Sequence, residues 1–291
     1  MSLPMMTRRA FTLVELLVVI VIIVIMMGMI LAAIQRVRAA AQRVRCENNL
    51  HQIGIALGDY GAKMESLPSN GGWDGVQTIP SKDGTPFTPE TYVTYNELQL
   101  RWGTGDPKLT PKDQTGSWLY VLLPYIEADK MFQDRIWTQP EPMYICPVRR
   151  AADPDECVAG DAYCDYLTGG WAWGKTDYAG SSFAFPVRPK CRSNSEFTRG
   201  LSQTILVGEK AYDASIESGT WFFDEPFFLG GSASTTRGGN YIYRDGAGMA
   251  FKHNWGSKHN GGANFLFGDG SVRILPFDTD PSTMQAYLRL Q

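Results

Sequence analysis

Histidine is scarce in this chain, and an excess of positive charge is absent. The 291 residues include three histidines, His51, His253 and His259, which argues against a metal site built from several histidines. Lysine and arginine number 27 against 30 aspartates and glutamates, so the formal net charge is −3. Because nucleic-acid binding needs a basic surface, we expect no nucleic-acid partner.

The short motifs of common enzymes and redox proteins are also missing. The sequence contains no H-E-x-x-H, G-x-S-x-G, Walker A or G-x-G-x-x-G pattern, and no C-x-x-C pair. We therefore expect no catalytic residues, and the zinc-ribbon and thioredoxin-like classes are excluded. Hydrophobic residues make up 44% of the chain, enough for most of it to form a packed core.

One long apolar run lies near the N-terminus. Residues 16–34, LLVVIVIIVIMMGMILAAI, contain no charge and no polar face. At about 1.5 Å per residue, such a helix crosses a hydrocarbon core of about 30 Å. A cleaved signal peptide needs a shorter run and an A-x-A-like site, whereas the one such triplet, 39–41, follows Arg36 and Arg38. We predict a retained membrane helix.

The residues before this run, RRAFTLVE at 8–15, resemble the N-terminal signature of type IV prepilins and type II secretion pseudopilins. The resemblance implies that prepilin peptidase cuts between Ala10 and Phe11, and that Phe11 is then N-methylated. It also implies that Glu15 pairs with the Phe11 amine of a neighbouring subunit during filament assembly. Neutralisation by an ammonium group is the physical reason for a carboxylate in an apolar helix.

Three features differ from that pattern. Ala10 replaces the glycine usual before the cut, and Ala32 lies where pilins often carry proline. Four arginines follow the apolar run against two before it, so the positive-inside rule alone would place the C-terminal side in the cytoplasm. We give the processing motif more weight. It predicts a single-pass protein of the cytoplasmic membrane, with its head in the periplasm or outside the cell.

Beyond the membrane segment the helix is expected to become amphipathic. An apolar stripe recurs at spacings of 4, 3, 4 and 3, which is one face of an α-helix: Cys46, Leu50, Ile53, Leu57 and Tyr60. This stripe should pack on the folded head. The predicted segments are a leader, a transmembrane and assembly helix, an amphipathic continuation and an extracytoplasmic head: 1–10, 11–34, 35–60 and 61–291.

The head is predicted to be α+β with an antiparallel sheet, because its elements do not alternate in βαβ order. Expected strands are 204–209, 219–224 and 240–246, and 117–127 is a core segment that could be helix or strand. Residues 263–267 and 271–277 should form a hairpin with a tight turn at Asp269-Gly270. Asp280-Pro281 should begin a C-terminal helix.

Six segments together resemble one prepilin-like family, whose signature is a histidine, nine residues and then Asp-Gly. They are RCENNLHQIGIAL (45–57), WLYVLLPYIE (118–127), YICP (144–147), DYAG (177–180), GLSQTILVGE (200–209) and SKHNGGANFLFGDGSVR (257–273). The signature residues here are His259, Asp269 and Gly270. The resemblance implies an exported, helix-anchored pseudopilin-like protein with a domain of unknown function, and not an enzyme.

The five cysteines are candidates for disulfides, because an exported head meets an oxidising compartment. Cys46–Cys146 is the first expectation, since YICP follows the core segment that should lie on the helix stripe. Cys157–Cys164 or Cys164–Cys191 would be a second bridge, with one cysteine left over. Connectivity stays open, and five free buried thiols are the alternative.

No cofactor is expected. His259 and Asp269 could bind a cation together, but one histidine and one aspartate are too few for a defined zinc site, so we favour a structural role. Calcium is the ion to consider, because some pseudopilin heads hold it in acidic loops. The candidate oxygen ligands are Asp269, Asp278 and Asp280, and neither 153–156 nor 278–280 completes an EF-hand.

These observations predict a structural subunit that assembles through its N-terminal helix into a type II secretion or type IV pilus-like filament. Its partners would be prepilin peptidase, copies of itself or other pseudopilins, and membrane lipid. The first alternative is a membrane-tethered binding or adhesion protein, in which Trp171 and Trp173 of a glycine-rich loop expose both rings to glycans. A hydrolase with an unrecognised site is the second.

Overall fold

The computed structural model describes residues 13–74, 77–80, 85–87, 90–93, 99–101, 103–156, 164–166, 172–213, 226–248, 251 and 253–290. The chain divides into two compact units between Val44 and Arg45. Helix α1 (Leu13–Met64) belongs to both. Ala10 and Phe11, the predicted cleavage residues, lie outside the described part of the chain.

Helix α1 is continuous from Leu13 to Met64, although it includes four glycines. It contains no proline, and its first turn carries Glu15 and its last turn Lys63, which suits the helix dipole. The helix ends where Glu65 adopts a left-handed conformation with φ of 57° and its N–H bonds the Gly61 carbonyl at 2.9 Å. The predicted helix is confirmed over the described residues and runs four residues beyond the expected end at Tyr60.

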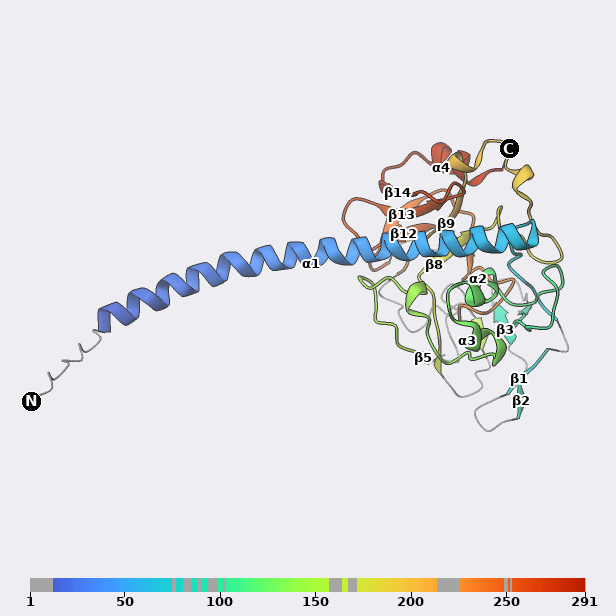
Figure 1. Ribbon diagram of the computed structural model, residues 1–291, viewed down its shortest axis with the longest axis horizontal. Coiled ribbons are helices and arrows are strands. Elements are labelled where there is room, and N and C mark those ends of the chain that lie inside the picture. The colour runs from blue at the N-terminus through green and yellow to red at the C-terminus, as the bar shows by residue number, and fades with distance from the viewer. Residues whose placement is uncertain are drawn as a thin grey trace, which may run out of the picture. The chain divides into compact units, whose positions relative to one another are not determined.

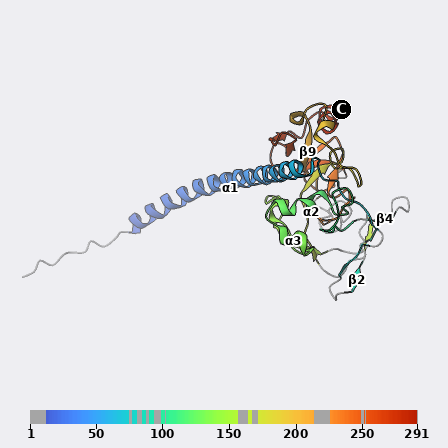
Figure 2. The same cartoon turned by 45° about the vertical axis from the view of Figure 1, so that its right-hand side comes forward.

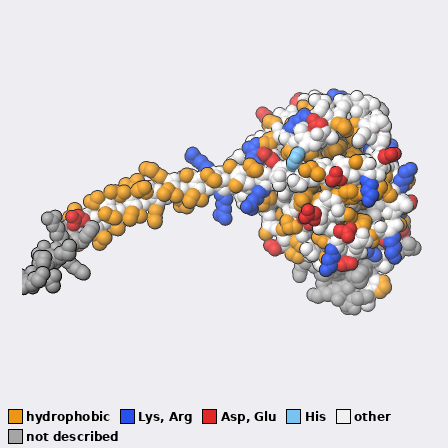
Figure 3. Space-filling model, in the orientation of Figure 1, with side chains coloured by type: hydrophobic (Ala, Val, Ile, Leu, Met, Phe, Trp, Pro, Cys, Tyr) orange, Lys and Arg blue, Asp and Glu red, His pale blue; other side chains and the backbone are white. Residues whose placement is uncertain are grey.

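The described part of the first unit, residues 13–44, is one helix that begins with a long apolar run. Its large hydrophobic side chains from Leu13 to Ile34 are 45–80% exposed, and they line the helix along the face seen in Figure 3. By length and composition α1 is the one helix among the described residues that could cross a membrane. A helix that is hydrophobic all round is stable in lipid rather than in water.

The second unit is an α+β head, as predicted. Its helices beyond α1 are α2 (Trp118–Leu122), α3 (Asp129–Gln133) and α4 (Pro281–Leu288). Its main sheet has the order β10 (Thr236–Arg237), β8 (Tyr178–Ser181), β9 (Ile205–Glu209), β13 (Ala263–Phe267) and β14 (Val272–Leu275). Neighbours in this sheet are antiparallel except β10, which pairs with β8 in parallel, so the sheet is mixed rather than purely antiparallel.

Smaller sheets complete the described strands. They are β1 (Ile79–Pro80) with β2 (Pro86–Phe87), β4 (Gln99–Arg101) with β3 (Glu90–Val93) and β6 (Cys164–Tyr166), β5 (Asp155–Glu156) with β7 (Ala172–Trp173), and β11 (Ile242–Arg244) with β12 (Trp255–Ser257). The β11–β12 pair is parallel. Short 3-10 turns lie at Leu123–Tyr125, Pro142–Tyr144, Asn194–Glu196 and Leu201–Gln203.

Most predicted head elements are present. The hairpin forms from β13 and β14, with Gly270 at φ 82° in its turn, and Asp280 caps α4 by accepting from the Ser282 and Thr283 backbone N–H groups. The strand at 204–209 is β9, and 240–246 contains β11. The core segment 117–127 begins as helix α2, with Ser117 as its N-cap. The strand expected at 219–224 lies outside the described residues.

The two faces of the main sheet serve different helices. In β13, Ala263, Phe265 and Phe267 pack in one core with Met284 and Leu288 of α4. Leu266, on the opposite face, packs in the other core with the C-terminal part of α1. In the two ribbon views this part of α1 has β9 on one side and α2 on the other (Figures 1 and 2). The sheet face toward α1 therefore depends on that helix for its cover.

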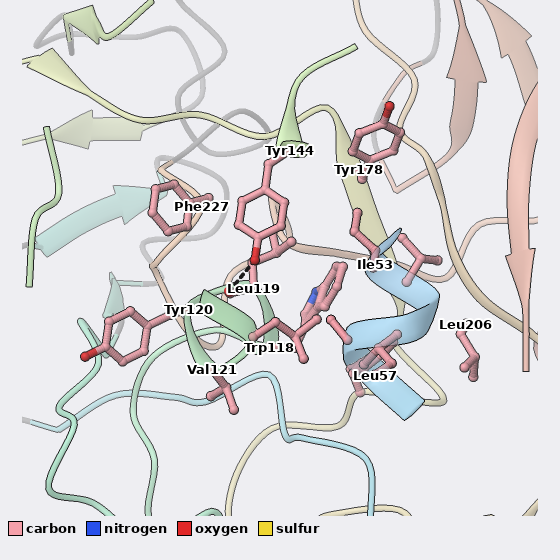
Figure 4. Packing of buried hydrophobic residues seen from close by; sticks show 14 of the residues in the cluster. Ile53, Leu57, Trp118, Leu119, Tyr120, Val121, Tyr144, Tyr178, Leu206 and Phe227 are labelled. Atoms are coloured by element: carbon pink, nitrogen blue, oxygen red, sulfur yellow. Dashed lines mark hydrogen bonds between the residues drawn. The ribbon is translucent and has the colours of Figure 1, made fainter. Parts of the chain in front are cut away.

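The predicted stripe is the centre of this second core. All five of its side chains are buried, none more than 3% exposed: Cys46, Leu50, Ile53, Leu57 and Tyr60. In Figure 4, Leu57 of α1 lies between Trp118 of α2 and Leu206 of β9. Tyr144 is also buried here and donates its hydroxyl to the Leu119 carbonyl at 2.8 Å. The heptad-like spacing thus identified the docking face correctly.

Gly54 sets how closely α1 approaches the sheet. A Cβ at this position would lie 2.8 Å from Cδ1 of the buried Leu266, whereas a Cβ on Gly58, one turn later, meets nothing within 4 Å. Gly58→Ala should stabilise the protein by about 1 kcal/mol through helix propensity alone. Gly54→Ala should give a smaller gain or a net loss, because Leu266 must move. Denaturant unfolding of the full chain in detergent compares the two, and equal gains would contradict this packing.

Candidate functional site: a buried cysteine, histidine and glutamate cluster

Four side chains that can bind a metal ion meet inside the head. Cys46 comes from α1, Cys146 follows the 3-10 turn at Pro142–Tyr144, Glu209 ends β9, and His259 follows β12. One ligand atom from each lies within 4.8 Å of all the others. All four residues are buried, from 0% exposed for Cys46 and Glu209 to 6% for His259.

Strand register explains why Glu209 points toward the helix. Leu266 pairs with Val207, and both belong to the core beside α1. Because side chains alternate along a strand, Glu209 and Asn264 face the same side two positions away. Their contact confirms this, since Asn264 donates its backbone N–H and its side-chain amide to Glu209 Oε2 at 2.7 and 3.1 Å.

The distances form a chain of contacts across the cluster. Sγ of Cys46 lies 2.9 Å from Sγ of Cys146, which lies 3.6 Å from Nε2 of His259. That nitrogen is 3.0 Å from Oε1 of Glu209. One carboxylate oxygen of Glu209 is therefore held by Asn264, while the other faces the imidazole and the sulfurs.

The electrostatics differ for the histidine and the thiol. Burial alone would lower the pKa of His259, but its hydrogen bonds with Cys146 and Glu209 outweigh burial and raise that pKa to about 10. The pKa of Cys146 is raised by its hydrogen bond with Cys46 and by burial. In the metal-free cluster the His259 imidazole and the Cys146 thiol are therefore both protonated near neutral pH.

The predicted first cysteine pair is adjacent in space. A disulfide has an S–S length of about 2.03–2.05 Å, and Cys46 and Cys146 are separate thiols at 2.9 Å. Their bridging stays a prediction. The thiol of Cys191 is also free and lies 3.7 Å from the Pro111 carbonyl oxygen. Cys157 lies outside the described residues, as does the side chain of Cys164, so the second bridge stays a prediction too.

The signature residues separate into two environments. His259 joins the buried cluster, whereas Asp269 lies in the hairpin turn, where it accepts from Ser271 and forms an ion pair with Arg273 at 3.1 Å. The Gly270 carbonyl oxygen of the same turn lies 3.3 Å from Nδ1 of His51 on α1. His259 and Asp269 therefore have different partners among the described residues, and a cation site formed by the two together stays the alternative that we did not favour.

The acidic residues considered for calcium have other partners or lie apart from the cluster. Asp280 caps α4 and Asp269 holds the hairpin turn, while Asp278 is exposed. Among the described residues, the cysteine, histidine and glutamate cluster is the one group of three or more metal-binding side chains. Calcium binding at the three aspartates stays a prediction, because among the described residues they do not form a group of metal ligands.

The sequence analysis did not identify Glu209 as a site residue or as the partner of His259. A signal existed, because Glu209 ends the apolar run ILVGE, and the structure buries every residue of this strand. A charged residue in such a strand requires a buried partner. Sequence alone could not say which residue that partner is, because His259 lies 50 positions away.

The tryptophan platform proposed for glycans is also wrong at one of its two positions. Trp173 is 0% exposed and stands 5.4 Å from Phe228, ring centre to ring centre, inside the main core. Trp171 lies outside the described residues. Trp118, expected in the core, is fully buried and donates its indole N–H to the Thr235 carbonyl at 2.7 Å.

Comparison with known families gives two matches. Residues 35–282 match the family described as "Protein of unknown function (DUF1559)", which covers most of the chain. Residues 5–31 match the prokaryotic N-terminal methylation motif, the prepilin-type processing signal. No curated protein and no solved structure matches the chain. Cys46, Cys146, Glu209 and His259 all fall within the first match.

A buried charge network supports the segment that carries Cys146. Arg149 forms ion pairs with Asp177 at 3.3 Å and Asp245 at 2.8 Å, and it donates to the Lys210 carbonyl at 2.8 Å. Asp177 in turn accepts from the Cys146 backbone N–H at 2.8 Å. The charged side chains therefore fix the loop that brings one sulfur to the helix.

Arg149→Met should destabilise the protein by about 3–5 kcal/mol, because it leaves the buried Asp245 carboxylate without its cation. Asp177 keeps its ion pair with Arg150 at 2.7 Å. Arg199→Met, at an exposed arginine, is the matched control and should change stability by no more than about 0.5 kcal/mol. Denaturant unfolding of both full-length variants in detergent provides the comparison. A similar small effect for the two would show that Arg149 does not hold this loop.

Proposed function

The chain belongs to the DUF1559 family of proteins of unknown function and carries a prokaryotic N-terminal methylation motif, and from this pairing we propose that it is a pilin-like structural subunit of a filament. The motif indicates prepilin-type processing by prepilin peptidase. The proposed cut lies between Ala10 and Phe11, with methylation of the new Phe11 amine. The head would then lie outside the cytoplasmic membrane.

The observation that carries this proposal is the contrast between the two parts of α1. Before Val44 the large apolar side chains are exposed on every face, and after Arg45 an apolar stripe is buried in the head. A helix exposed in this way needs lipid or the same helix from other subunits around it. The first environment suits a membrane reservoir of subunits, and the second suits a filament core.

Glu15 has a defined role in this proposal. It lies in the first turn of α1, next to exposed Val14 and Leu16. A carboxylate in such surroundings is costly unless a cation neutralises it. The methylated amine of Phe11 on a neighbouring subunit would supply that cation and would set the axial register between neighbouring helices.

The runner-up is a tethered binding protein that uses the prepilin route for processing alone. Burial of Trp173 removes part of the aromatic platform that motivated it. Catalysis has no support in the families matched, which point to a structural pilin-like protein. We therefore keep filament assembly as the proposal.

Glu15→Ala should leave cleavage and membrane insertion intact while reducing incorporation into filaments about tenfold or more, the effect of about 1.4 kcal/mol per contact. The measurement is the amount of the subunit in sheared filaments relative to the processed pool in the membrane. Asp59→Ala, which removes an exposed carboxylate from the same helix within the head, is the control and should assemble normally. Unchanged incorporation of Glu15→Ala would refute the pairing mechanism.

A further inference from the structure

We propose that Cys46, Cys146, Glu209 and His259 form a structural zinc site that joins helix α1 to the head. The four residues supply two sulfurs, one imidazole nitrogen and one carboxylate oxygen, all within 4.8 Å of one another. Four protein ligands without an open position are typical of zinc sites that stabilise a fold rather than catalyse a reaction. This inference does not depend on filament assembly.

The donor chemistry selects the ion. Two cysteine sulfurs exclude calcium and magnesium, which prefer oxygen ligands. Thiolates suit zinc and copper(I), and the additional carboxylate oxygen of Glu209 favours the harder divalent zinc ion. Zinc can therefore bind the cysteine sulfurs and the Glu209 oxygen in one site.

The spacing requires a small local adjustment. In a tetrahedral site with Zn–S of about 2.3 Å and Zn–N of about 2.0–2.1 Å, sulfur and nitrogen ligands lie about 3.6 Å apart. Cys146 Sγ and His259 Nε2 lie 3.6 Å apart. Two thiolates on one zinc lie about 3.8 Å apart, so the sulfurs of Cys46 and Cys146 must separate from their present 2.9 Å. Rotation of the two cysteine side chains would have to provide this movement, and Nε2 of His259 and Oε1 of Glu209 would have to separate from 3.0 Å.

Neighbouring groups already orient the ligands. Asn264 holds Glu209 Oε2 and leaves Oε1 directed at the cluster. The Asp177 carboxylate fixes the Cys146 backbone at 2.8 Å, and the Ser257 hydroxyl accepts from the His259 backbone N–H at 3.1 Å. Such outer-shell hydrogen bonds are a regular part of metal sites, because they hold ligands in one orientation.

A disulfide between the same cysteines is the competing state, and it cannot coexist with this site. It would use both sulfurs but give no role to Glu209 and His259, which are buried and directed at them. Zinc uses all four side chains, and each thiol gives up its proton when it binds the ion.

Because the ligands are buried and come from four separate segments, zinc must enter before α1 has fully docked. The ion then joins α1, the Cys146 loop, β9 and the loop after β12. Its removal should loosen the helix–head contact without changing the apolar half of α1. The site would in this way control how firmly the stripe from Cys46 to Tyr60 is held in the head.

The first test uses the full-length chain purified from its native membrane in detergent, without added thiol reagents or chelators. Elemental analysis should find one zinc ion per chain. Replacement by Co²⁺ should give the visible absorption of a tetrahedral thiolate site together with a sulfur-to-metal charge-transfer band. Neither reading depends on a variant that must fold.

Variants then locate the ion. In Cys146→Ser the Co²⁺ charge-transfer band should disappear or fall to the intensity of a single thiolate. Cys191→Ser should keep its full zinc content. Asn264→Ala, which removes the side-chain amide bonded to Glu209, should weaken zinc binding by about 10–100-fold.

A Cys46–Cys146 disulfide in the native protein, or a metal-free wild-type chain that fails to bind added Zn²⁺ under reducing conditions, would overturn the proposal. Zinc lost through Cys191→Ser and kept in Cys146→Ser would overturn it as well.

Discussion

Docking of the C-terminal part of α1 on the head is the interaction on which the rest of the structure depends. Leu50, Ile53 and Leu57 fill the space between α2 and the main sheet. Each such side chain contributes about 1.5–3 kcal/mol when it is fully buried. Without the helix, the sheet face that carries Leu206 and Leu266 would lose its cover. The core of the head is therefore complete only when the C-terminal part of α1 is packed in it.

The two parts of helix α1 are therefore suited to different surroundings. The uncharged residues 16–34 are suited to lipid or to other apolar helices, and the stripe from Cys46 to Tyr60 is suited to a water-soluble core. The exposed apolar residues and the buried stripe belong to one continuous helix. Firm attachment there is what a subunit of a filament requires, and a crosslink at Cys46 would act at the start of the docked region.

Features that follow from local periodicity could be predicted from the sequence. The stripe from Cys46 to Tyr60, the hairpin turn at Gly270 and the cap at Asp280 each depend on a few neighbouring residues, and each is present. The same stripe placed Cys46 against the head, and the contact with Cys146 confirmed that placement. Local signals were enough because helical spacing, a glycine at positive φ and a capping carboxylate each act on residues close in sequence.

Features that depend on long-range pairing could not be predicted. His259 meets Glu209 instead of Asp269 because the β9–β13 register decides which face of the sheet Glu209 occupies. The parallel pairing of β10 with β8 depends on a chain path that no short motif encodes. Trp173 is buried because Phe228 packs against it from a distant segment. In each case the decisive partner lies far away in sequence.

Prepilin-type processing is tested most directly by the N-terminus of the protein extracted from its native membrane, read by mass spectrometry. We expect a chain that begins at N-methylated Phe11, which would establish this processing. An intact N-terminus at Met1 would contradict it. The apolar helix would then be an ordinary membrane anchor, and the arginines from Arg36 to Arg45 would place the head on the cytoplasmic side.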